Sequence, residues 1–467
     1  MHPLCCPELL SPPGDLIFMA RNRNACTVLV RTLFIMTLSA GLSACSGDSW
    51  FGDDVKPPVP GTRISVLEHE RSLKHDPDLA ASIRLPAPED NAQWPQQGGY
   101  SHHAMQHMKV SASPKVAWIR SIGSGSGRRD RLMGEPVVAN GTVYTIDTSG
   151  VVTALNAQSG ATLWHKALAP DHEDDGYLMG GGVAFNNGRL FVTTGFADVI
   201  ALKADKGEEI WRRSVPAPMR AGPTVSDGRV FVTTLDNKAL ALSEENGSIV
   251  WTYSGVEENT SVLGAAAPAV MGGVGIFPFT SGEVVALRTD TGAALWADSV
   301  VATRRTDATG TLAAIAARPV IDRTRIFVLG HSGLLTGIDM RTGERAWELS
   351  MAGLHQPWIA GDWLFAVTLD AEVVAIDARN GKIAWITSLD LWEDPEDRKG
   401  RITWAGPVLA SDRLVLAGSH GKAVSINPYD GAVIGHLDMP AGISLSPAVA
   451  HEALYFLTDA GDVVCVR

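Results

Sequence analysis

One short motif recurs along most of this chain and limits the folds that the chain can adopt. The motif is Gly-x-x-x-Trp, and an alternating apolar stretch precedes each copy. Between 38 and 51 residues separate successive Trp of the six complete copies, which end at Trp164, Trp211, Trp251, Trp296, Trp347 and Trp385. A period of 40–50 residues with strand-like alternation is typical of a β-propeller rather than of a helical solenoid. The sequence therefore predicts a ring of small β-sheets.

Each repeat divides into four short strands separated by turn residues. The first strand opens near a proline, as at Pro136, where a strand needs no amide donor. Asn-Gly pairs such as Asn246-Gly247 provide the positive φ of tight hairpin turns. Much of the glycine content, 47 residues in all, belongs to these turns.

The two ends of the repeat region complement each other. Trp118, in Val116–Ile119, belongs to a last strand that lacks the three strands before it, whereas residues 453–467 provide three strands that lack a fourth. Joining them gives eight four-stranded antiparallel blades and removes exposed sheet edges. We therefore predict an all-β, eight-bladed propeller over residues 94–467, closed by pairing its N- and C-terminal strands.

The recurring tryptophans are predicted to be structural. A large indole at the same place in every unit can wedge between adjacent blades and donate its N–H to a neighbouring carbonyl. Sites spread around a ring cannot all face one ligand. The positions are Trp118, Trp164, Trp211, Trp251, Trp296, Trp347 and Trp385.

The first 44 residues have the character of a secretory signal, with a plausible start at Met19. Basic residues precede a short apolar run at 33–38, and the signal ends in Leu42-Ser-Ala-Cys45, which resembles the bacterial lipobox. That resemblance implies cleavage before Cys45, acylation of this residue, and sorting to the outer membrane. The alternative is ordinary cleavage after small residues, with Cys45 incidental.

Residues 45–93 are polar and proline-rich and are expected to form a flexible, lipidated tether ahead of the propeller. The formal net charge of −12 excludes a broad basic footprint for nucleic acid. Five cysteines are too few for a disulfide scaffold.

The repeat resembles the PQQ-type β-propeller repeat, as in Ala375-Ile-Asp-Ala-Arg-Asn-Gly-Lys-Ile-Ala-Trp385. Quinoprotein alcohol dehydrogenases of that kind bind PQQ beside a vicinal Cys-Cys disulfide. The only Cys-Cys pair here, Cys5-Cys6, precedes the signal. We therefore expect no enzyme activity and no cofactor.

The lipobox, tether and eight blades together resemble the BamB family, the lipoprotein subunit of the outer-membrane β-barrel assembly (BAM) machinery. Residues 60–68 and 94–99 look like the alphaproteobacterial branch of that family. The resemblance implies a non-catalytic scaffold, lipid-anchored at the periplasmic face of the outer membrane, that assists insertion of β-barrel proteins. Its partners would be the POTRA domains of the BamA-type barrel subunit and other BAM subunits.

The family's partner-binding loops point to two segments of this chain. The first presents Thr260, Val262 and Leu263, and the second presents Arg304 and Arg305 where the family has an acidic loop. Ordinary packing at the start of a strand is an equally good explanation of Val262 and Leu263.

Two further readings remain open. His102, His103 and His107 could chelate a metal, but no fourth ligand follows at a suitable spacing, so we expect a solvated loop and no metal site. The alternative function is a periplasmic PQQ- or sugar-binding propeller, an enzyme or a sensor, that uses the central channel.

Overall fold

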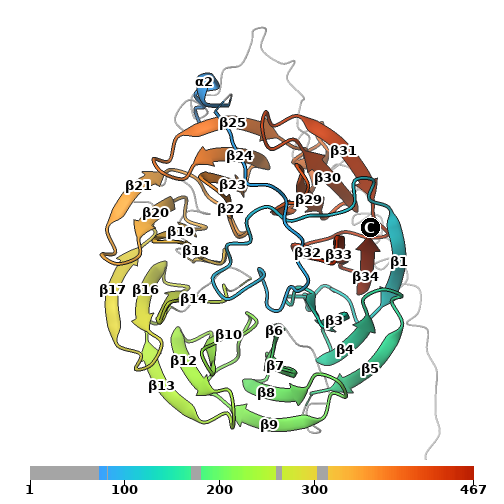
Figure 1. The fold of residues 1–467 in the computed structure, drawn as a ribbon, viewed down its shortest axis with the longest axis vertical. Coiled ribbons are helices and arrows are strands. Elements are labelled where there is room, and N and C mark those ends of the chain that lie inside the picture. The colour runs from blue at the N-terminus through green and yellow to red at the C-terminus, as the bar shows by residue number, and fades with distance from the viewer. Residues whose placement is uncertain (1–72, 81, 170–179, 259–263, 265, 302–313) are drawn as a thin grey trace, which may run out of the picture. The chain divides into compact units, whose positions relative to one another are not determined.

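The computed structural model describes residues 73–80, 82–169, 180–258, 264, 266–301 and 314–467. The chain divides into two units, Met1–Arg71 and Ser72–Arg467, and all described residues belong to the second. This unit contains eight four-stranded antiparallel sheets arranged as the blades of a ring (Figure 1). The predicted all-β, eight-bladed propeller is confirmed.

Within each blade the first strand lines the centre of the ring and the fourth lies at its rim (Figure 1). Blades 1 to 4 consist of β2–β5 (Val137–Ala139, Thr142–Ile146, Val151–Asn156, Thr162–Ala167), β6–β9 (Gly181–Asn186, Arg189–Thr194, Asp198–Lys203, Glu209–Ser214), β10–β13 (Thr224–Ser226, Arg229–Thr233, Lys238–Ser243, Ile249–Ser254) and β14–β17 (Ala269–Met271, Val274–Pro278, Glu283–Arg288, Ala294–Ser299).

Blades 5 to 8 complete the ring, and a separate hairpin precedes blade 7. Blades 5 to 7 are β18–β21 (Val320–Asp322, Arg325–Leu329, Leu335–Asp339, Arg345–Leu349), β22–β25 (Trp358–Ala360, Trp363–Val367, Glu372–Asp377, Ile383–Ser388) and β28–β31 (Trp404–Leu409, Leu414–Gly418, Lys422–Ile426, Val433–Asp438). The hairpin is β26–β27 (Trp392–Asp394, Lys399–Arg401), and blade 8 is β32–β34 (Ala448–Ala450, Ala453–Leu457, Asp462–Val466) with β1 (Val116–Ser121).

Blade 8 closes the ring with strands from the two ends of the propeller. The sheet order is β1-β34-β33-β32, and β1 pairs antiparallel with β34, so that Trp118 lies opposite Cys465. Backbone bonds between Lys115 and Arg467, of 2.6 and 2.9 Å, continue this pairing beyond the strand. The predicted closure is confirmed.

The seven repeated tryptophans lie between neighbouring blades. Each indole Nε1–H donates to a backbone carbonyl of the next blade, at 2.9–3.3 Å; for example, Trp164 bonds Ala204 at 3.1 Å. Each ring also lies over the glycine that begins the next blade's motif, so a Cβ added at Gly207 would come within 2.8 Å of Trp164. The glycine and the tryptophan of one motif therefore serve two different blade interfaces.

Blade 7 has Gly435 in place of this tryptophan, and the closure explains the exception. The partner of such a tryptophan would be a glycine turn between the third and fourth strands of blade 8. Those strands are β34 and β1, and no turn joins them because the chain ends at Arg467 and re-enters at Lys115. A tryptophan at position 435 would have no glycine to pack against.

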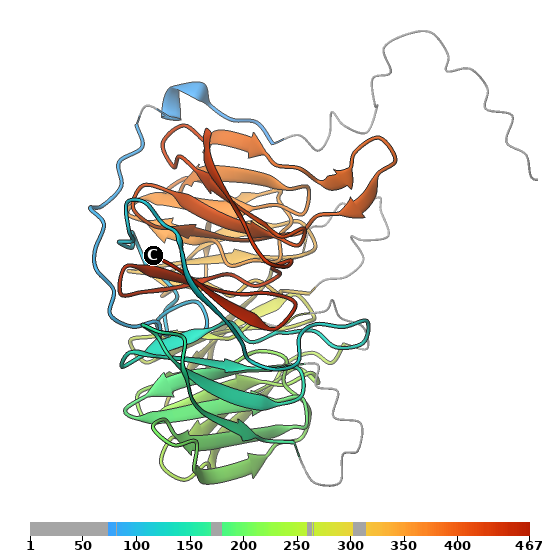
Figure 2. The ribbon, with the colours of Figure 1, turned by 90° about the vertical axis from the view of Figure 1, so that its right-hand side faces the viewer.

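The chain ahead of β1 lies along one face of the propeller (Figures 1 and 2). It begins with the short helix α2 (Pro77–Ala80), beside β25, and continues across the centre of the ring. Contacts with the blades begin at His75, which forms a parallel bridge with Ile383, earlier than the expected start of the propeller at residue 94. The described residues include no helix that is long and apolar enough to span a membrane.

Candidate docking faces and a closed central channel

Residues 91–111, which we call the channel loop, contact the inner strand or first turn of every blade. The loop passes once around the ring, and each blade bonds it in turn. Its partners, from blade 1 to blade 8, are Val138, Phe185, Val225, Val270, Ile321, Trp358, Leu409 and Val449. The innermost strands of a propeller are sheet edges with unpaired backbone groups, and here the chain pairs them itself.

Gln96 shows how the channel loop does this with a side chain. Its amide donates Nε2–H to the Val225 carbonyl at 2.8 Å and accepts from the Val225 amide at 2.9 Å. Gln96 is 6% exposed. One glutamine side chain therefore satisfies both backbone groups of a buried strand residue, as a neighbouring strand would.

An ion pair crosses the channel beneath the loop. Glu135 precedes the inner strand of blade 1 and Arg318 precedes that of blade 5, on the opposite side of the ring. Their side chains meet at 2.6 Å and are 5% and 13% exposed. Gln356 accepts from Arg318 at 2.8 Å, and the Gly98 amide donates to Glu135 at 3.2 Å.

Gly98 fits this network because it has no side chain. Its φ is +77°, and a Cβ there would lie 2.3 Å from Gln356 Oε1 and 2.9 Å from Arg318 Nε. The ion pair, Gln356 and the channel loop together close the centre of the ring. The sequence gave no signal for this arrangement, because Glu135 and Arg318 belong to different repeats and neither is part of the motif.

The histidines of the channel loop are partly buried structural residues, so the expected solvated loop is wrong. His103 and His107 are each 1% exposed, and each Nδ1 bonds a proline carbonyl, Pro319 at 2.8 Å and Pro86 at 2.7 Å. His107 Nε2 accepts from the Asp412 amide at 2.9 Å, which leaves it no free nitrogen for a metal. Burial lowers the pKa of His103 to about 3, and the nearby Arg318 lowers it further.

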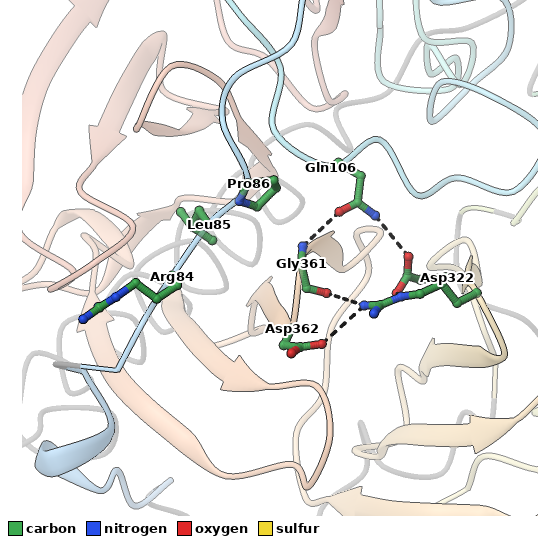
Figure 3. A pocket seen from close by; sticks show the side chains of 8 residues that line it. Arg84, Leu85, Pro86, Gln106, Asp322, Gly361 and Asp362 are labelled. Atoms are coloured by element: carbon green, nitrogen blue, oxygen red, sulfur yellow. Dashed lines mark hydrogen bonds and ion pairs between the residues drawn. The ribbon is translucent and has the colours of Figure 1, made fainter.

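A shallow pocket lies where the chain ahead of the channel loop crosses blades 5 and 6 (Figure 3). Gln106 donates to Asp322 at 3.1 Å and accepts from the Gly361 amide at 2.9 Å. Arg323 donates to the Gly361 carbonyl at 2.8 Å and pairs with Asp362 at 3.3 Å. The polar groups of the pocket bond one another, so this site fastens the loop to the blades.

The residues predicted to bind the partner lie outside the described residues. This holds for Thr260, Val262, Leu263, Arg304 and Arg305, and equally for the lipidation candidate Cys45. The described chain on either side of the two loops shows where they attach. Both loops connect the outer strand of one blade to the inner strand of the next, at the face opposite the channel loop, from which the β26–β27 hairpin also projects (Figure 2).

The attachment points of the two loops are held together by Asn237. This residue is 1% exposed, and its Nδ2 donates to the carbonyl of Val256, ahead of the first loop, at 2.6 Å. Its Oδ1 accepts from the Thr280 amide and hydroxyl at 3.0 and 2.8 Å. The adjacent Phe279 carbonyl accepts from the Ile315 amide, after the second loop, at 3.3 Å. A small cleft lined by Asn237, Phe279 and Ile315 lies there.

These features define a class of protein: a β-propeller whose channel is filled by its own chain and whose available surfaces are loops and blade edges. Among the described residues, no three His, Cys, Asp or Glu side chains are grouped so that they could hold a metal ion. The family described as outer membrane protein assembly factor BamB matches residues 148–387. BamB of Escherichia coli is 32% identical over 361 residues, which cover 76% of this chain and 89% of that protein. The chain belongs to the BamB family.

Solved structures agree with this fold. The crystal structure of BamB from Moraxella catarrhalis superposes with a TM-score of 0.63 at 21% identity, and the match covers 75% of this chain and all of that one. A europium-containing methanol dehydrogenase gives the same TM-score at 15% identity, covering 78% of this chain and 89% of the enzyme. At these identities the likeness to both concerns the fold alone.

Proposed function

We propose that this chain is a non-catalytic scaffold of the outer-membrane protein assembly machinery. It docks periplasmic POTRA domains of the BamA-type barrel subunit and thereby assists the insertion of β-barrel proteins. Acylation at Cys45 anchors it to the periplasmic face of the outer membrane, with residues 46 to about 74 as the tether. The sequence at 60–68 and 94–99 favours the alphaproteobacterial branch of the family.

The closed channel is the observation that carries this proposal. A propeller that converts or senses a small molecule at its centre needs an open cavity with convergent polar groups. Here Glu135, Arg318 and Gln356 bond one another across that space, and the channel loop covers it. Family membership at 32% identity supports an assembly role, and the paired attachment points near Asn237 support docking by the two loops.

Affinity purification from detergent-solubilised membranes tests the proposal. We expect barrel-assembly subunits to co-purify with the wild-type chain and to be lost with Val262→Glu/Leu263→Glu. The matched control is Leu163→Glu, an apolar residue of the rim that is already 53% exposed. Absence of those subunits from the wild-type preparation would refute the docking function.

The alternative, a PQQ-binding propeller, shares only the fold with the methanol dehydrogenase. Titration of the purified chain with PQQ and Ca²⁺, followed by absorbance, separates the two functions. We expect no saturable spectral change, because the channel holds no space for the quinone. Saturable binding that Glu135→Ala alters would favour the alternative.

A further inference from the structure

The outer strands of the blades carry a second kind of surface. Each is a sheet edge, and proteins usually protect such edges with charged side chains. Six of the eight outer strands contain charged residues or histidine, as in β9, whose sequence is Glu-Ile-Trp-Arg-Arg-Ser. Only β13, Ile-Val-Trp-Thr-Tyr-Ser, and β25, Ile-Ala-Trp-Ile-Thr-Ser, contain none.

The chain covers one of these two uncharged edges itself. His75 bridges Ile383 of β25 in parallel, the Asp76 amide donates to the Ile383 carbonyl at 2.8 Å, and α2 follows against the strand. Ile383 and Ala384 are consequently 3% and 1% exposed. An extended segment followed by a helical turn thus occupies this edge (Figure 1).

The equivalent edge of β13 is open. Ile249 and Val250 occupy the same places relative to Trp251 as Ile383 and Ala384 do relative to Trp385, yet they are 44% and 46% exposed. In the described part of the chain, no backbone hydrogen bond reaches the outer edge of β13. Two neighbouring apolar side chains therefore stand beside unpaired backbone groups.

Charge around β13 selects its occupant. Glu245 is exposed at one end of the strand, and Glu257 and Glu258 are exposed at the other. The nearest lysine beside the second end, Lys238, is paired with Asp236 at 2.5 Å. An added strand would meet an apolar centre between two acidic ends, so basic residues on both flanks would complement it.

We propose that β13 binds an extended strand of a partner protein by β-augmentation, with apolar side chains at its centre and Lys or Arg at both ends. This deepens the proposed docking function and rests on it, because β13 leads directly into the first predicted docking loop. Backbone pairing provides affinity, while Ile249 and Val250 select apolar residues in the partner.

A fluorescent ten-residue peptide of alternating Val and Thr, flanked by Lys, is the probe. We expect saturable anisotropy with the wild-type chain, at least tenfold weaker binding to Val250→Lys, and no change with Leu163→Lys, the matched position in β5. A peptide with central Pro should not bind, and Glu flanks should weaken binding. Equal binding to the Val250→Lys and wild-type chains, or no binding to the wild type, would overturn the inference.

Two further measurements separate this inference from its neighbours. Co-purification of assembly subunits without peptide binding would overturn strand addition but leave the docking function standing, whereas peptide binding without co-purification would support the edge and refute that function. Sedimentation of the wild-type and Val250→Lys chains tests a second copy as the occupant. A dimer that Val250→Lys dissociates would overturn the choice of partner.

Discussion

Glu135 and Arg318, which precede the inner strands of opposite blades, form an ion pair of 2.6 Å across the centre of the ring. The pair belongs to neither blade alone, so it exists only when the ring is complete. It also fills the place where other propellers of this fold hold ligands. This contact therefore links ring closure to the absence of an open channel.

Removing one partner of this ion pair should destabilise the propeller strongly. Both side chains are largely buried, and an uncompensated buried charge costs about 3 kcal/mol or more. We expect Glu135→Gln or Arg318→Met to lower the free energy of unfolding by about this amount, measured by urea denaturation. The double variant should recover much of the loss, and equal effects in the single and double variants would contradict the pairing.

Gln96 should matter more than a neighbouring glutamine of the same segment. Gln96→Leu leaves the buried N–H and C=O of Val225 without partners, which should cost about 2 kcal/mol. Gln93→Leu is the control, because Gln93 is only half-buried and makes one exposed bond of 3.3 Å to Asn140. Faster hydrogen exchange at Val225 in the first variant alone would identify the cause.

The motif glycines can be tested by comparing two residues with similar backbone conformations. Gly207 has φ +68° and faces Trp164 at 2.8 Å, whereas Gly188 has φ +77° with nothing within 4 Å of its added Cβ. Gly188→Ala should cost about 1 kcal/mol for the positive φ. Gly207→Ala should cost about 1–3 kcal/mol more because it displaces the indole. Thermal unfolding of the two variants should separate these contributions, and equal losses would show that the indole adjusts freely.

Stability should fall as the pH drops below that of ordinary histidine titration. The pKa of His103 is about 3 in the folded protein and near 6.5 when unfolded, so only the unfolded chain binds the proton between these values. His103 therefore contributes no pH dependence above pH 6.5, and below it costs up to ~1.4 kcal/mol per pH unit.

Replacing His103 should flatten this part of the stability profile. His103→Gln keeps a donor for the Pro319 carbonyl but removes the titrating group, so its free energy of unfolding should decline less between pH 6.5 and 4. Urea midpoints across this range give the comparison. His165→Gln, at an exposed position in β5, should leave the slope unchanged. Parallel slopes for wild type and His103→Gln would contradict the assignment.

The parts of the fold that repeat were predictable from the sequence. Gly207 and Trp211 recur with the same spacing in other copies, and the incomplete repeats around Trp118 and Cys465 supply the strands that each other lacks. These features depend on local alternation and turn chemistry, which a sequence displays directly. The missing tryptophan at Gly435 was visible too, although its reason needed the closure at Arg467.

The centre of the ring was not predictable in the same way. Gln96 bonds a strand 129 residues away, and Glu135 meets Arg318 across 183 residues. Such contacts have no period, and the polar composition of the channel loop resembles that of a solvated segment. His103 and His107 appeared exposed for this reason, although tertiary contacts bury both.

The composition of blade 8 has a consequence for how the protein is made. Its rim strand is among the first to be synthesised and its other three are the last, so the earliest strand has no partner until the final residues exist. The channel loop likewise needs all eight inner strands before its bonds are complete. A prematurely terminated chain would lack the seam that holds its two ends together. Quality control is thus built into the topology, because only a complete product can seal itself.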